Sequence, residues 1–554
     1  MKKTIVFTIL IALGFLAQAQ DKVWVFFKDK DTANFNPYTF FDSKAIERRM
    51  LNGINLYDYT DVPVNEAYIS QIIEITQNNR AVSRWFNAVC CLATPEQQKE
   101  LLKLPFVSSV RIVSSEIQKY FAGMEQTDDE GNFTPTDDEI DFLKAQIKRM
   151  NGETFSNNKI DGSGVRVAIF DVGFKSYKTN PAFEHIRAEN RIIATYDFAK
   201  NKENVDCGGT HGCFVMSCVG GKINGQIMGL ATGAQYLLAR TETRTEFYAE
   251  EENWLEAAEW ADKNGADIIN SSLGYTIHRY FVEDMDGTHS LVAKAANMAA
   301  SKGIIVVNSA GNEGSNDWKR IGTPADADSV LSIGGINPKT GIHTSFSSFG
   351  PTWDKRMKPN VTAYGHVIGS GPKGISETQG TSFSGPLVAG FVACAKQIRM
   401  GYKSMDLFHE IEKSADLYPY FDYAHGYGVP QAKYFIIPFP QEPSPSFEIV
   451  VKSKTIEIML TDTTSIDEET LKWEGRYVKC PDYLFYHIQN DKGYLDKYFV
   501  IDPFGSLFSD KYLSVEDEDL TQTLSPLKIK KTDYARPFTL RVFYRGYFKE
   551  IVIK

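Results

Sequence analysis

The most constraining feature of the sequence is an order of helix-like segment, glycine and short β-branched strand that occurs twice. The two occurrences are residues 254–263, Gly265 and 267–270, and then residues 291–301, Gly303 and 304–308. This alternation is typical of parallel strands joined by crossover helices. We therefore predict that residues 145–437 form an α/β domain with a doubly wound, mostly parallel sheet. Functional groups on such sheets collect at the carboxyl ends of the strands.

Three polar residues stand beside apolar runs of this region. They are Asp171 after 165–170, His211 before 213–219 and Ser382 before 387–398. A serine hydroxyl attacks a carbonyl when a base takes its proton, and an imidazole with a pKa of about 6.5 suits that task. A carboxylate holds the imidazole in the required tautomer. Singly, each residue is better explained as a turn, loop or cap residue, whereas together they predict acyl-transfer chemistry.

A fourth polar residue, Asn312, follows the predicted strand 304–308 in a glycine-rich sequence. A carboxamide there can donate a hydrogen bond to the oxyanion that forms when a carbonyl is attacked, together with the backbone amide of Ser382. The helix predicted after Ser382 adds the positive end of its dipole. Alone, Asn312 would be explained as a turn residue. With the other three residues it predicts oxyanion stabilisation.

Four segments resemble the sequence blocks of subtilisin-like serine proteases, the subtilases. They are residues 165–173, 210–221, 306–314 and 380–390. The order Asp, His, Ser along the chain is also the subtilisin order. The resemblance covers about residues 145–432 and implies that Asp171, His211 and Ser382 form a catalytic triad. It also implies that Asn312 belongs to the oxyanion hole.

The same resemblance implies which residues bind the substrate side chain before the cut bond. The walls of this pocket would come from Ser272, Leu273, Gly274, Ala310 and Gly311, and its floor from Gly322. Because a glycine floor carries no side chain and no carboxylate is evident, we expect a roomy apolar pocket. The peptide bond between Thr323 and Pro324 is expected to be cis, as it often is in the family.

The N-terminal region has the pattern of a small α/β unit. It contains strand-like runs at 23–27, 85–92 and 107–113 and a helix that follows Thr94 with a capping box completed by Gln97. Its segments 86–89 and 106–110 resemble subtilase propeptides. This implies that residues 20–118 assist folding, block the cleft as an inhibitor and are removed by the enzyme itself. The acidic residues 119–144 are predicted to be a linker that contains the processing site.

Residues 1–19 have the layout of a secretory signal peptide, with Lys2 and Lys3 before an apolar run and the ending Ala17-Gln18-Ala19. We therefore expect a secreted or periplasmic protein. At the other end, the proline-rich residues 438–446 predict a stiff linker. Alternating strand-like runs beyond it predict a β-sandwich over residues 447–554.

Net charge and cysteine content give information on possible partners and on disulfide pairing. The 554 residues carry 60 Lys and Arg against 70 Asp and Glu, a formal net charge of −10 without a long basic run, which argues against nucleic acid as a partner. Seven cysteines cannot all pair within one chain. We predict mostly buried free thiols, with a disulfide between Cys207 and Cys213 as the less favoured alternative.

Together these features predict a secreted serine endopeptidase, made as a zymogen, that hydrolyses peptide bonds through an acyl-enzyme. The expected partners are protein or peptide substrates and the chain's own propeptide, with no nucleic acid and no membrane span after signal removal. The chemistry requires no cofactor; structural calcium is compatible with the resemblance, and metal ligands stay unassigned. Two alternatives stay open: a catalytically silent subtilase-fold binding protein, and a narrow maturation protease or peptide transferase.

Overall fold

The computed structural model describes residues 20–113, 132–243, 249–276, 279–437, 442–461, 482–502 and 526–554. These residues form two compact units. The first consists of residues 20–35 and 59–113, and the second of residues 36–58 and the described residues from 132 onward. The predicted signal peptide, residues 1–19, lies outside the described residues, as do residues 114–131.

The first unit is a four-stranded antiparallel sheet in the order β2-β3-β1-β4, with two helices packed on it. Its elements are β1 (Asp21–Phe27), η1 (Tyr59–Asp61), α3 (Glu66–Thr76), β2 (Ala81–Ser83), β3 (Ala88–Ala93), α4 (Pro95–Leu101) and β4 (Val107–Val113). The predicted capping box starts α4: Thr94 Oγ1 accepts from the Gln97 amide at 3.3 Å, and Gln97 Oε1 accepts from the Thr94 amide at 2.8 Å. The strand predicted over 85–92 begins only at Ala88, because Asn87 has a φ of 50° and forms a turn.

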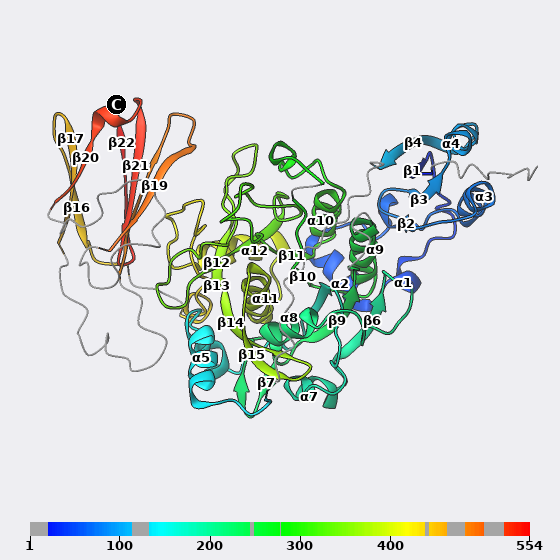
Figure 1. The fold of residues 1–554 in the computed structure, drawn as a ribbon, viewed down its shortest axis with the longest axis horizontal. Helices are drawn as coiled ribbons and strands as arrows, with labels where there is room; N and C mark the ends of the chain where they lie inside the picture. Colours follow the sequence, from blue (N-terminus) through cyan, green and yellow to red (C-terminus); the bar gives the residue numbers. More distant parts are fainter. Residues whose placement is uncertain are drawn as a thin grey trace, which may run out of the picture. The chain divides into compact units, whose positions relative to one another are not determined.

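The second unit is built on a seven-stranded parallel sheet with helices on both faces, which confirms the predicted fold class (Figure 1). In spatial order the strands are β13 (Val361–Tyr364), β12 (Val330–Ile336), β11 (Ile305–Ser309), β10 (Ile268–Ser271), β5 (Arg166–Asp171), β9 (Gln235–Arg240) and β6 (Ile192–Asp197). Since chain order reverses direction next to β5, the sheet has its switch point there, where α/β sheets bind ligands.

Two pairs of helices cover the two faces of this sheet. The pairs are α8 (His211–Gly220) with α11 (Thr381–Ile398), and α9 (Ala249–Lys263) with α10 (Leu291–Ser301). Successive side chains of β5 point to opposite faces of the sheet and so pack against both pairs of helices. Phe170 packs edge-on against Trp254 of α9, with ring centroids 5.5 Å apart. Its neighbour Ile169 belongs to the apolar core that α8 and α11 form with the sheet.

Shorter elements complete the part of the second unit that surrounds the parallel sheet. They are α1 (Pro37–Phe40), α2 (Ser43–Asn52), α5 (Asp137–Lys148), α6 (Glu153–Asn157), η2 (Pro181–Phe183), α7 (Glu184–Ala188), β7 (Lys222–Ile223), β8 (Gln226–Ile227), η3 (Val282–Asp284), β14 (His366–Gly371), β15 (Gly374–Gln379), α12 (Ser404–Lys413) and α13 (Lys433–Ile436). Helix α5 begins inside the stretch predicted to be a linker. Thr136 and Glu139 form a capping box at its start, and Phe142 and Leu143 are buried in the core. The folded unit therefore begins before residue 145.

Residues 36–58 also depart from the expectation of one continuous propeptide unit over 20–118. They fold with the second unit, where Arg48 and Arg49 of α2 pair with Asp262 at the end of α9. Local sequence patterns cannot reveal this association, because the acid and the two arginines are far apart along the chain.

The C-terminal residues form two antiparallel sheets that share one apolar core, as predicted for a β-sandwich. One sheet contains β16 (Phe447–Val451), β17 (Thr455–Leu460) and β20 (Leu527–Lys530), and the other contains β19 (Leu495–Ile501), β18 (Leu484–Gln489), β21 (Phe538–Tyr544) and β22 (Tyr547–Ile553); η4 (Lys531–Asp533) follows β20. The predicted hairpin turn between β21 and β22 is present. Arg545 and Gly546 both have positive φ, as a tight hairpin turn requires.

The described cysteines are all free thiols, so the alternative of a Cys207–Cys213 disulfide is wrong. The Cys213 sulfur lies 3.1 Å from the Lys175 carbonyl oxygen, and the Cys207 sulfur lies 3.5 Å from a carboxylate oxygen of Asp197. Cys480 lies outside the described residues. In the part of the chain that the structure describes, no helix has both the length and the apolar character needed to cross a membrane.

Candidate active site

The carboxyl end of β5 and the start of α8 bring Asp171 and His211 together. Asp171 is the last residue of β5 and is completely buried, and His211 is the first residue of α8. The His211 Nδ1 atom lies 2.9 and 3.0 Å from the two carboxylate oxygens of Asp171. The backbone amide of Val172 donates to the same carboxylate at 2.8 Å. The carboxylate is therefore held from both sides, with the imidazole 27% exposed beyond it.

The electrostatic effect on His211 has two opposing causes. Burial lowers the pKa of His211, but the charge of Asp171 and the hydrogen bond to it outweigh burial. The net result is a pKa above the usual value of about 6.5. Two residues further along α8, burial raises the pKa of the Cys213 thiol well above its usual range, and Asp171 adds to that rise. The thiol beside the histidine is therefore protonated and unreactive at neutral pH.

Ser382 lies in the first turn of α11, which packs against α8. Gly380 caps this helix with a φ of 139°, a backbone conformation that side-chain-bearing residues rarely adopt. The Phe383 ring lies 5.3 Å from the His211 ring, which places the serine segment beside the histidine. The Ser382 hydroxyl itself donates to the Ser272 carbonyl at 3.4 Å.

A proline inside α11 explains a further contact of Ser382. Pro386 has no amide hydrogen, so it cannot donate to the carbonyl four residues earlier, which is that of Ser382. The Ser272 hydroxyl donates to this carbonyl instead, at 2.9 Å. This hydrogen bond therefore connects Ser382 to the segment expected to line the substrate pocket. It replaces the helical hydrogen bond that Pro386 cannot make.

Asn312 is oriented by the residue next to Ser382. Its Oδ1 atom accepts from the backbone amide of Thr381 at 2.9 Å and from the Thr381 hydroxyl at 3.0 Å. The Gly311 amide also donates to that hydroxyl, at 3.2 Å. A Cβ added at Gly380 would lie 3.5 Å from Nδ2 and 3.8 Å from Oδ1 of Asn312, so the whole carboxamide lies beside the start of α11, with its oxygen engaged by Thr381. Asn312 can thus present an N–H group at the N-terminus of α11.

The six residues expected to form the substrate pocket come together in the structure. Two segments pair where Tyr275 and Thr323 exchange backbone hydrogen bonds of 2.9 and 3.1 Å, and the Gly322 amide donates to the Ala310 carbonyl at 3.4 Å. Through Gly322, these contacts join the segment after β10, which carries Ser272, Leu273 and Gly274, to the segment after β11, which carries Ala310 and Gly311. A Cβ added at Gly274 would meet nothing within 4 Å, so this glycine borders open space. The peptide bond between Thr323 and Pro324 is cis, as expected.

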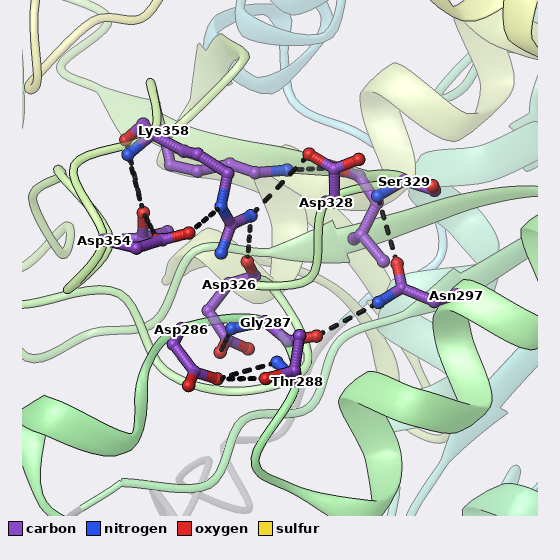
Figure 2. A network of polar contacts seen from close by, with 12 residues as sticks. Asp286, Gly287, Thr288, Asn297, Asp326, Asp328, Ser329, Asp354 and Lys358 are labelled. Carbon is purple, nitrogen blue, oxygen red and sulfur yellow. Dashed lines mark hydrogen bonds and ion pairs between the residues drawn. The ribbon is translucent and has the colours of Figure 1, made fainter.

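Sequence reasoning missed a polar network around Asp326 (Figure 2), whose backbone amide donates to the carbonyl of Gly322, the expected pocket floor, at 3.1 Å. The buried Asp326 accepts from the Gly287 amide at 2.8 Å through its carboxylate and from Arg356 at 2.7 Å through its carbonyl. Arg356 is in turn bound to Asp354 at 2.7 Å. Burial raises the pKa of Asp326, against the opposing effect of its hydrogen bonds and of Arg356. The residues of this network come from separate loops, and no local sequence pattern predicts them.

A second group of charges that was missed from the sequence lies around Tyr275, the residue after Gly274 of the expected pocket wall. Arg279 pairs with Glu251 at 3.0 Å and lies over the Tyr275 ring, 4.5 Å from its centroid. Glu250 accepts from the Thr243 amide at 3.1 Å. Burial raises the pKa of Glu250 to about 7, although the charge of Arg279 opposes this. Acidic residues in the first turn of a helix are common, so the sequence alone offers no reason to single these out.

Among the described residues, no three or more His, Cys, Asp or Glu side chains are arranged to hold a metal ion. Structural calcium therefore stays a prediction without ligands.

Comparisons with known proteins show which proteins the chain is similar to. Residues 162–428 match the family described as the subtilase family, and residues 22–129 match the peptidase S8 propeptide domain of Bacteroidota. The membrane-bound transcription factor site-1 protease of Homo sapiens is 32% identical over 240 residues, 42% of this chain and 20% of that protein. The thermophilic serine proteinase of Bacillus sp. (strain AK1) is 28% identical over 256 residues, 46% of this chain and 57% of that protein.

The chain thus spans between a fifth and about three fifths of the length of these two relatives. Among solved structures, fervidolysin from Fervidobacterium pennivorans, a keratinolytic enzyme related to subtilisin, resembles the chain with a TM-score of 0.51. It is 16% identical, and the match covers 95% of this chain and 71% of that one. At this identity the likeness concerns the fold.

Proposed function

Residues 162–428 belong to the subtilase family of serine peptidases, and on this basis we propose that the chain is a secreted serine endopeptidase made as a zymogen. The observation that carries the proposal is the pairing of a fully buried Asp171 with His211 at 2.9 Å, next to the helix start that bears Ser382. A propeptide domain ahead of the catalytic domain supports the zymogen.

In the proposed reaction, Ser382 attacks the peptide carbonyl while His211 takes its proton and then passes it to the leaving amine. Asp171 keeps His211 in the tautomer with a proton on Nδ1 and stabilises the imidazolium that forms. The amide of Ser382 and Nδ2 of Asn312 would hold the oxyanion, with the positive end of the α11 dipole behind them. Water then releases the acyl group by the same path.

Processing would cut the chain between residues 114 and 136, since β4 ends at Val113 and α5 is folded from Asp137. Export would depend on residues 1–19, whose signal layout is a sequence-based prediction. The substrates would be proteins or peptides whose side chain before the cut bond fits between Gly274 and Gly322.

The test compares wild type with Ser382→Ala by fluorophosphonate labelling and intact mass. We expect only wild type to be labelled and to lose the mass of an N-terminal fragment. Ser384→Ala is a matched control, because this serine lies in the same helix turn but is buried and donates to the Tyr364 carbonyl at 3.1 Å. It should be labelled like wild type.

Absence of labelling in processed, folded wild type would favour the catalytically silent alternative. Labelling of wild type without self-cleavage would support the proposed serine peptidase activity but contradict autocatalytic processing. Labelling combined with transfer of the acyl group to an added amine in preference to water would identify the peptide transferase.

A further inference from the structure

A buried arginine at the carboxyl end of β9 contacts the segments next to Asp171 and His211. Arg240 is the last residue of β9, and it lies opposite Asp171 where β9 pairs with β5. Its side chain is only 7% exposed. A guanidinium is rarely buried unless its charge is paired and its donors are bound. The proposed mechanism gives Arg240 no part, so its partners indicate its role.

The first partner of Arg240 is the backbone carbonyl of Val172, the residue after Asp171. Arg240 Nε donates to this carbonyl at 2.8 Å. The amide of Gly209, two residues before His211, donates to the same oxygen at 3.2 Å. The Val172 amide itself donates to the Asp171 carboxylate at 2.8 Å. The backbone of Val172 therefore connects the carboxylate of Asp171 to the loop that leads into His211. Arg240 binds the oxygen through which this connection runs.

The second partner of Arg240 is Asp197, the last residue of the neighbouring strand β6 (Figure 1). Arg240 Nη1 lies 2.9 Å from one carboxylate oxygen of Asp197, whose side chain is completely buried. The other carboxylate oxygen accepts from the Lys200 amide at 3.0 Å. The charge of the arginine is therefore paired inside the fold. Because Nε and Nη1 belong to one rigid planar group, the pair with Asp197 also fixes the direction in which Nε points at Val172.

The loop before α8 packs directly against this guanidinium. Gly208 has a φ of 76°, and a Cβ added there would lie 2.6 Å from Arg240 Nε and 2.5 Å from the Val172 oxygen. Only a glycine permits so close an approach. Gly173 forms an antiparallel bridge with Gly208. The Gly173 carbonyl also accepts from the Gly212 amide, in the first turn of α8, at 3.1 Å. The start of α8 is thus placed against the end of β5 by backbone contacts around one buried arginine.

We propose that Arg240 is a positioning residue of the triad, which aligns the Asp171 carboxylate with the His211 ring through Val172 and the loop before α8. The proposal rests on the proposed function, because it concerns the same reaction. A misplacement of about 1 Å can slow catalysis about 10²-fold, so loss of the arginine should slow acylation about 10–10²-fold. A buried pair that only stabilised the fold would instead leave the rate per folded molecule unchanged.

The test replaces the ion pair as a unit, with Arg240→Met and Asp197→Asn in one protein, because removal of one partner would leave the other charge buried and unpaired. In every variant the recognition sequence of an added site-specific protease is inserted between Gly123 and Met124, and the protein is cut there, so that all rates refer to one processing state. The measurement is the second-order rate constant of fluorophosphonate labelling per folded molecule. We expect the pair variant to be labelled about 10–10²-fold more slowly than wild type.

The same substitutions in an Asp171→Asn background distinguish positioning from general loosening of the fold. Without the carboxylate, His211 has no anion with which to be aligned, so the pair substitutions should then cost less than about threefold. The pH profile gives a second readout, because the pair substitutions remove one charge of each sign. The midpoint of labelling should nevertheless move to lower pH, since a displaced Asp171 offsets less of the burial that lowers the pKa of His211. An equal loss in both backgrounds, or an unchanged midpoint, would overturn the proposal.

Arg149→Met with Asp416→Asn is the matched control, because it removes the same two side chains from a pair at 2.6 Å. Arg149 ends α5 and Asp416 follows α12, and neither segment carries a residue of the candidate active site. This control should be labelled at the wild-type rate.

If the Arg240 pair variant does not accumulate as folded protein, Arg240→Lys makes the same comparison. It keeps a charge for Asp197 but loses the planar group that binds in two directions, so labelling should again be slower. Labelling of the folded variants within about threefold of the wild-type rate would contradict a positioning role. Failure of the proposed function would instead appear as absent labelling of the cut wild type.

Discussion

Replacing Asp171 by asparagine tests the pairing on which the proposed mechanism depends. The carboxylate lies 2.9 Å from Nδ1 of His211, which is partly exposed. Coulomb's law at this distance, with an effective dielectric constant of about 20, gives an attraction of about 6 kcal/mol for the imidazolium that forms during attack. Since about 1.4 kcal/mol corresponds to a factor of ten in rate, we expect Asp171→Asn to slow acylation about 10⁴-fold. A loss of this size is known for the same substitution in a triad on another fold.

The assay is the second-order rate constant of fluorophosphonate labelling, which requires no knowledge of the substrate. Circular dichroism and gel filtration establish that the variant is folded, so that the rate is compared per folded molecule. A folded Asp171→Asn protein that is labelled within tenfold of the wild-type rate would refute the role of Asp171.

The chain contains a matched control for this experiment. Asp422 is completely buried and lies 3.0 and 3.1 Å from Nδ1 of His425, so this pair has the same side chains at distances within 0.1 Å of those of the Asp171–His211 pair. Asp422→Asn should therefore lower the free energy of unfolding while leaving the labelling rate per folded molecule unchanged. If both variants lost labelling equally, the loss would reflect general destabilisation rather than the Asp171–His211 pair.

The pH dependence supplies an independent check. Only the neutral imidazole accepts a proton, and the pKa of His211 lies above about 6.5 because Asp171 outweighs burial. Labelling by wild type should therefore fall as the pH drops through a midpoint above 6.5. In Asp171→Asn burial acts alone, so the midpoint should move to lower pH. A midpoint that does not move would contradict the stated cause of the shift.

Three further outcomes are expected. Asn312→Ala should lower turnover about 10²–10³-fold, the known cost of losing this donor in subtilisin, with little change in KM in peptide hydrolysis. Gly322→Ala should raise KM for peptides with a large side chain before the cut bond more than for alanine peptides, because the added Cβ would lie 2.6 Å from Thr276 Cγ2 and force the pocket floor to shift. Burial lowers the pKa of His487 to about 4, so the folded state binds fewer protons than the unfolded state between about pH 6.5 and 4. The free energy of unfolding should therefore decrease as the pH is lowered across this window. Urea unfolding should show a decrease about 3 kcal/mol larger in Ser382→Ala than in the double variant that also carries His487→Gln.

Local sequence was sufficient where the physical cause is local. The capping box at Thr94, the hairpin turn at Arg545 and the strand that ends in Asp171 all follow from residues within a few positions of one another. Such interactions join a residue to its third or fourth neighbour, or alternate along a strand, so they appear as short patterns. The error at the start of the domain is also local: the sequence predicts a linker up to residue 144, because the capping box of α5 lies in an acidic stretch that resembles a linker.

The sequence by itself therefore predicted the parallel sheet, the helices and strands with clear local signals, and the positions of four polar residues next to strand and helix ends. Only the tertiary structure decided which distant groups meet. It directs the Ser272 hydroxyl to the carbonyl that Pro386 leaves without a helical donor. It also places two arginines of the N-terminal region on Asp262. The pair of Asp422 and His425 shows why tertiary structure is decisive. It has the same buried acid and imidazole as the pair of Asp171 and His211. The proposed chemical role of a pair depends on the serine that strand order and helix packing bring near the histidine.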